Sequence, residues 1–71
     1  MFERIVGTTR WFSARLGYGF IRKDDGEEIF VHYSAIQTPG YKRLREGQKV
    51  EFRIEEGEKG YQAAEVVPVE D

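Results

Sequence analysis

The chain lacks cysteine altogether, and among its 71 residues it has one histidine and one tryptophan. Without cysteine it can form neither a disulfide framework nor a thiolate zinc site, and His32 alone cannot build a histidine metal cluster. A chain of this length buries only about 60% of the surface that its unfolded form exposes. We therefore expect one domain over residues 1–71, with its core over about residues 4–68, stabilised by apolar packing without a metal or cofactor.

Long apolar runs are missing as well. Residues 1–6 lack the apolar stretch of a secretory signal, and no run approaches the roughly 20 residues of a membrane-spanning helix. We expect a cytoplasmic protein with no membrane partner.

Acidic residues slightly outnumber basic ones, but the positive charge is segregated along the chain. The net charge of −2, taken as an average, argues against a nucleic-acid partner. Residues 1–22, however, carry four arginines and one acid, and residues 42–45 add three bases. Residues 46–71 hold eight acids against three bases. The positive charge therefore lies largely in the half of the chain that also carries most of the aromatic residues.

Alternation with period 2 and regularly spaced turn residues predict an all-β fold. The five predicted strands are residues 4–12, 18–23, 29–33, 48–55 and 62–67. The segment Asp24-Asp25-Gly26-Glu27 predicts a tight hairpin between the second and third strands. Residues 34–47 show no sustained period and predict a long functional loop. Because a closed barrel hides its strand edges, we expect a five-stranded antiparallel barrel.

Two of these strands have one aliphatic and one aromatic face. The aliphatic face, which we expect to lie against the core, carries Ile21, Ile29 and Val31. The opposite face carries Tyr18, Phe20, Phe30 and His32. An alternating aromatic strand by itself is more commonly part of a core, but here the aliphatic face already supplies one. The rings are therefore predicted to face solvent and to bind a flat partner.

Catalytic interpretations find little support in the same residues. His32 has no second histidine, cysteine or nucleophile motif beside it, and the carboxylates of residues 55–58 fall in a solvated hairpin without an enclosing pocket. Gly17 and Gly19 lack the third glycine of a dinucleotide-binding loop. We expect no enzyme. A barrel whose aromatic face receives a peptide or another subunit stays open as the alternative to nucleic-acid binding.

The segments Gly17-Tyr18-Gly19-Phe20-Ile21 and Phe30-Val31-His32-Tyr33 resemble the two ribonucleoprotein motifs of the cold-shock domain. Further blocks at residues 10–12, 34–37, 47–48 and 60–64 are similar to those of bacterial cold-shock proteins, so the resemblance covers residues 5–67. It implies an OB-fold, a five-stranded oligonucleotide-binding barrel. It also implies binding of single-stranded RNA and DNA, with pyrimidine-rich strands preferred, by an RNA chaperone or transcription antiterminator. We expect a monomer, with dimerisation as the alternative.

The resemblance also implies which residues touch the nucleic acid. Its stacking residues correspond to Trp11, Tyr18, Phe20, Phe30, His32, Tyr33 and Tyr41. Its polar contacts correspond to Arg10, Gln37 and Gln62. Phe12 is a further candidate, and like Tyr33 and Tyr41 it is open between a ligand contact and a place in the barrel. Glycines on both sides of Tyr18 are expected to leave space for a base.

Several positions depart from the family pattern. Thr8 and Leu16 stand where lysines are common, which predicts fewer phosphate contacts, although Arg15 restores some charge. Tyr61 replaces a usual proline, and it either extends the stacking surface or covers the barrel rim. Strict alternation would turn Trp11 inward, so its exposure requires a bulge near Arg10.

Overall fold

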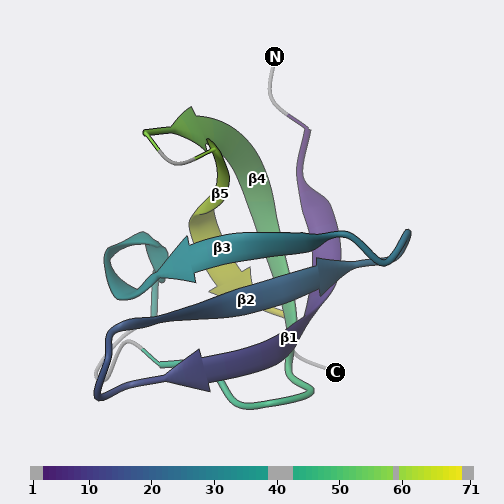
Figure 1. The fold of residues 1–71 in the computed structure, drawn as a ribbon. Helices are drawn as coiled ribbons and strands as arrows, with labels where there is room; N and C mark the ends of the chain where they lie inside the picture. Colours follow the sequence, from purple (N-terminus) through teal and green to yellow (C-terminus); the bar gives the residue numbers. More distant parts are fainter. Residues whose placement is uncertain (1–2, 39–42, 59, 70–71) are drawn as a thin grey trace.

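The computed structural model describes residues 3–38, 43–58 and 60–69. The chain forms β1 (Ile5–Ser13), β2 (Tyr18–Lys23), β3 (Glu28–His32), a short 3₁₀ helix η1 (Tyr33–Ala35), β4 (Lys49–Gly57) and β5 (Gly60–Pro68). The strands close into a barrel in the order β1-β2-β3-β5-β4 (Figure 1). The predicted all-β, five-stranded OB-type barrel is confirmed. No helix within the described residues is long and apolar enough to cross a membrane.

One pair of neighbouring strands in the barrel is parallel. β1 pairs antiparallel with β2 and β4, and the β2–β3 and β4–β5 pairs are antiparallel too. β3 and β5 instead run in the same direction, with Phe30 opposite Gln62. The expectation of antiparallel pairing throughout is wrong here. Directions cannot alternate all the way around a ring with an odd number of strands, so closure leaves one parallel pair.

The core fills the inside of the barrel with aliphatic side chains and one phenylalanine. The predicted inward residues Ile21, Ile29 and Val31 are all buried, which confirms the division into two faces. The complete cluster is Ile21, Ile29, Val31, Ile36, Leu44, Val50, Phe52, Ala63 and Val66.

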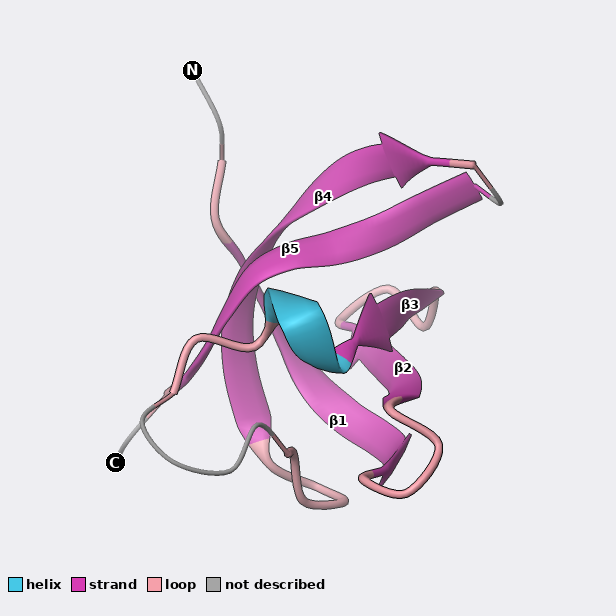
Figure 2. Ribbon diagram, turned by 90° about the vertical axis from the view of Figure 1, so that its left-hand side faces the viewer, coloured by secondary structure: helices cyan, strands magenta, loops and turns pink. Residues whose placement is uncertain are grey.

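Residues 34–47 do more than connect two strands. Ile36 forms a parallel bridge with Val66 of β5, and both Ile36 and Leu44 belong to the core cluster. Figure 2 shows η1 at the end of β3, beside β5. The described residues between η1 and β4 form the predicted loop, but the sequence did not predict that Ile36 and Leu44 of this loop pack in the core. Ile36 and Leu44 are isolated apolar residues outside the named strands, so the sequence around them shows no hydrophobic period.

A bulge in β5 changes which alanine enters the core. The pairing with β4 shifts register between Glu51 and Arg53, and Glu65 opposite this shift has a φ of 51°. The extra residue moves the alternation by one position. Ala63 consequently joins Val66 in the core cluster, whereas simple alternation had placed Ala64 with Val66. Ala64 is also buried, but outside that cluster.

Ion pairs on the outer surface connect β4 with β5. The Arg53 Nε lies 2.5 Å from the Glu65 carboxylate, and an Arg4 guanidinium nitrogen lies 3.9 Å from the same side chain. The hydrogen bond from Arg53, together with the positive charge of that guanidinium, lowers the pKa of Glu65 below its ordinary value of 4.5. Glu65 therefore binds its proton less readily in the folded protein than in the unfolded chain.

This shift predicts how acid acts on the fold. Because the pKa of Glu65 is lower in the folded state, its ion pairs stabilise the fold above the unfolded pKa, and this contribution is lost as the pH falls through the folded value. Urea unfolding of the native chain and of Glu65→Gln, measured between about pH 7 and about pH 3, should show the stability difference shrinking on acidification. Glu56→Gln is the control, because Glu56 has no ion pair within the described residues. A difference that stays constant with pH would contradict the expectation.

Candidate nucleic-acid interface

The β2–β3 pairing places the predicted aromatic residues side by side. Tyr18 lies opposite His32, and Phe20 lies opposite Phe30. Because Gly19, between Tyr18 and Phe20, is buried, the alternation turns the rings outward. His32 is exposed, and the three other rings are half-buried.

Trp11 reaches the same surface through a bulge in β1. Its pairing with β2 passes from Thr9 opposite Ile21 to Trp11 opposite Phe20, so Arg10 is the extra residue. Thr9 is buried, whereas Trp11 is 42% exposed. The expected bulge near Arg10 is thus confirmed, and it places the tryptophan on the outer face.

Four rings contact one another on this surface. Trp11 lies 5.7 Å from Tyr18 and 6.4 Å from Phe20 between ring centroids. Phe30 lies 5.7 Å from Tyr18 and 6.0 Å from Phe20. Trp11–Phe20 and Tyr18–Phe30 are stacked pairs, and the others meet edge to face. We call these four residues the aromatic cluster. Because the rings hold one another in place, their side chains lose less conformational entropy when a partner binds.

The glycines beside Tyr18 have structural reasons of their own. A side chain at Gly19 would collide with the backbone of Trp11 and Phe12, so β1 and β2 approach closely at this point. Gly17 has a φ of 86°, which favours glycine in the turn before β2. Space for a base is therefore not needed to explain either glycine.

His32 and Tyr33 form a second pair of rings at the end of β3. Their centroids are 4.5 Å apart, and Tyr33 is 48% exposed. The Ser34 backbone N–H donates to Nδ1 of His32 at 3.2 Å. Nδ1 also lies 2.9 Å from the Ser34 hydroxyl, so Nε2 is the ring nitrogen without a partner among the described residues. The exposure of Tyr33 places this ring on the surface and not inside the barrel.

The other predicted site residues are spread around this surface. Phe12 is partly buried and packs against the core cluster. Gln37 is exposed beyond η1, and its backbone N–H donates to the Val66 carbonyl at 2.8 Å. Gln62 is half-buried on β5 opposite Phe30, and Tyr41 lies outside the described residues. Within the described part of the chain, no three histidine, cysteine, aspartate or glutamate side chains come together as a metal site.

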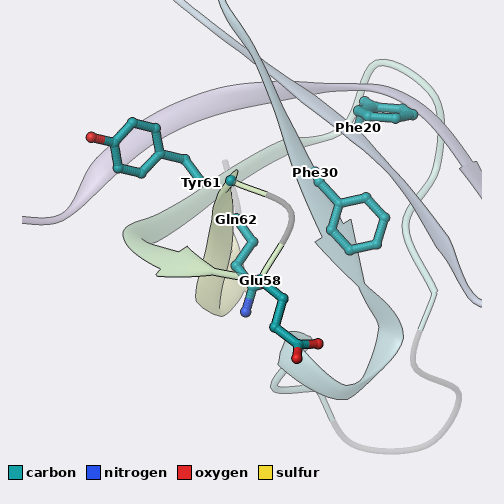
Figure 3. Close-up of a pocket in the computed structure, with 6 residues that line it drawn as sticks. Phe20, Phe30, Glu58, Tyr61 and Gln62 are labelled. Carbon is teal, nitrogen blue, oxygen red and sulfur yellow. The ribbon is translucent and has the colours of Figure 1, made fainter.

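A cleft of about 430 Å³ adjoins the aromatic cluster (Figure 3). Glu58 from the β4–β5 turn is exposed and lines this cleft, a neighbourhood that the sequence did not predict. Nothing in the local pattern could have revealed this, because the turn and the rings are far apart in the sequence. The lining residues are Phe20, Phe30, Glu58, Gly60, Tyr61 and Gln62.

Comparison with known proteins places this surface in context. The family model described as the 'Cold-shock' DNA-binding domain matches residues 5–69. The chain belongs to the cold-shock domain family. The cold shock-like protein of Thermotoga maritima is 58% identical over 64 residues, which are 90% of this chain and 97% of that protein. Cold shock protein 1 of Lactiplantibacillus plantarum is 60% identical over 62 residues, or 87% and 94% of the two chains.

Membership of the cold-shock family establishes the coarse function. The matched domain is described as DNA-binding, so the chain carries a nucleic-acid-binding domain. The finer features, which are the strand type and the residues in contact, depend on the geometry of the aromatic surface.

Carboxylates form ion pairs with several cations on β1 and β2 of this cold-shock domain. The Arg10 Nε lies 2.6 Å from Glu28, and Arg22 lies 3.5 Å from the same carboxylate. The Lys23 amine lies 3.0 Å from Glu27. These contacts leave less positive charge for phosphate than the arginine count alone suggests.

Proposed function

We propose that this chain binds single-stranded RNA and DNA, pyrimidine-rich strands best, by stacking bases on its exposed rings. The observation that carries the proposal is the set of four contacting rings on the outer face of β1, β2 and β3. Every base has a π face, and only an unpaired strand can present that face to a protein surface. The residues proposed to stack are Trp11, Tyr18, Phe20, Phe30 and His32.

The remaining predicted residues surround this surface and complete the proposal. Arg10 and Arg15 lie near the phosphates, which stay largely in solvent. Phe12, Tyr33, Gln37, Tyr41 and Gln62 are proposed as further contacts. Binding of this kind holds a strand open, which is the action of an RNA chaperone or a transcription antiterminator. One monomeric domain is sufficient for it.

Trp11 reports directly on binding because it is the only tryptophan in the chain. Titration with hexathymidine should quench its fluorescence and saturate at micromolar protein. A strand that leaves the emission unchanged would count against the proposal. Emission that instead changes with protein concentration alone would favour a protein partner on the same face.

The ion pairs beside the rings predict a weak dependence of binding on salt. Each phosphate neutralised on a single strand contributes about −0.7 to the slope of log K against log salt concentration. With Arg10 and Arg22 both near Glu28, we expect a slope that corresponds to only a few phosphates. Titrations of hexathymidine at several sodium chloride concentrations measure it. A slope that corresponds to about six phosphates or more would show that charge contributes more than stacking.

A further inference from the structure

The cleft beside the aromatic cluster combines stacking surface with polar groups. Phe20 and Phe30 belong both to the cluster and to the cleft, so a base stacked on Phe30 extends toward the start of β5. Figure 3 shows the ring of Tyr61 directed away from Phe30, with Gln62 and Glu58 between the two in this view. Tyr61 is 64% exposed and therefore does not seal the barrel rim. Besides Tyr61, the polar side chains that line this cleft are those of Gln62 and Glu58.

Gln62 lies against β4 at this cleft. Its side-chain amide donates to the Glu55 carboxylate at 3.4 Å. A side chain at Gly57 would meet the Gln62 amide, so the glutamine packs against the bare backbone of β4. Gln62 is thus a polar part of the cleft lining that already has one hydrogen-bond partner.

Glu58 differs from Glu55 and Glu65 of the β4–β5 hairpin. Glu55 and Glu65 both pair with Arg53, whereas Glu58 makes no ion pair or hydrogen bond within the described residues. It is exposed, it lines the cleft, and as a carboxylate it has only acceptors to offer. Such a group discriminates between ligands by the donors that they present.

We propose that Glu58 is a specificity-determining residue that reads the edge of a base stacked on Phe30 and selects guanine. Guanine presents two adjacent donors, its ring N1–H and its exocyclic amino group, and one carboxylate can accept both. In the other bases the donor stands beside a carbonyl or a ring nitrogen, whose lone pair repels a carboxylate. This inference rests on the proposed function, because it requires a base on Phe30. The proposal adds one guanine-selective position to a stacking surface that otherwise prefers pyrimidines.

The test uses hexathymidine strands in which one thymine is replaced by guanine, at each position in turn. Each is compared with the same strand carrying inosine at that position, because inosine lacks the exocyclic amino group. At one position, the native chain should bind the guanine strand about tenfold or more tightly than the inosine strand, because a hydrogen bond to a charged group is lost. Glu58→Gln should bring this ratio close to one, since its amide nitrogen opposes one of the two donors.

Glu56→Gln is the matched control because it removes the same charge from the same hairpin, outside the cleft. It should leave the guanine-to-inosine ratio unchanged. Equal binding of guanine and inosine strands at every position, or an equal loss of preference in both variants, would overturn the role of Glu58. If hexathymidine still binds and requires Phe30, only this inference fails. Absence of hexathymidine binding would remove the proposed function as well.

Discussion

Replacing Phe30 by alanine is expected to weaken hexathymidine binding about 5- to 150-fold, which corresponds to about 1–3 kcal/mol for one stacked base. Phe30 touches two other rings of the aromatic cluster, at 5.7 Å from Tyr18 and 6.0 Å from Phe20, and it also lines the cleft. Its loss therefore removes the stacking surface from the middle of the proposed site. The barrel should stay folded, because Phe30 lies outside the core cluster.

Two substitutions at the same position separate stacking from apolar contact. Phe30→Tyr keeps the flat ring and should bind close to native affinity. Phe30→Leu keeps much of the apolar bulk but has no π face, so it should resemble the alanine variant. Circular dichroism of each variant confirms folding, and Trp11 fluorescence measures the affinity. Native affinity in a folded alanine variant would exclude this ring from the site.

Replacing Phe52 by alanine is expected to cost about 3–5 kcal/mol of unfolding free energy. Phe52 is completely buried, and its strand partner is Ile5 of β1. It is the largest fully buried side chain of the described residues, so its removal leaves a cavity that the closed barrel cannot fill by collapse. A domain of this size has a total stability on the order of 5 kcal/mol, so the variant should keep at most about 2 kcal/mol and be partly unfolded at room temperature.

Urea unfolding followed by circular dichroism measures this effect. Phe52→Leu retains most of the volume and should lose much less stability than the alanine variant. Ile54→Ala, on the same strand but only partly buried, should also be milder. A Phe52→Ala variant within about 1 kcal/mol of the native chain would mean that the core relaxes around the missing ring.

Local pattern was sufficient to predict the strands and the faces of β2 and β3. Alternation assigned Ile21 and Val31 to the interior and Phe20 and Phe30 to the surface, because side chains on a strand must point to opposite sides. The bulge that exposes Trp11 was also predictable, since alternation and the family resemblance disagreed about that residue. In each case the evidence lies within a few residues of the chain.

Contacts between distant segments could not be predicted in the same way. The bulge at Glu65 moves Ala63 into the core through the register of β5 against β4. Ile36 and Leu44 enter the core from a segment without any period. Glu28 neutralises Arg10 across two strands that are not adjacent in the sequence. Each depends on how segments that are distant in the sequence are aligned in the folded barrel.

The sequence by itself determined that this is a small all-β chain of the cold-shock family with a row of aromatic side chains on one face. Those properties follow from side-chain alternation, turn residues and motifs, all of which are local. Only the tertiary structure decided that four rings contact one another, that Arg10 and Arg22 are paired with Glu28, and that Glu58 borders a cleft with Phe30. The ring contacts and ion pairs depend on the register of β1 and β3 against β2, and the cleft depends on the closure of the barrel that brings β3 against β5, and no local pattern contains these distances.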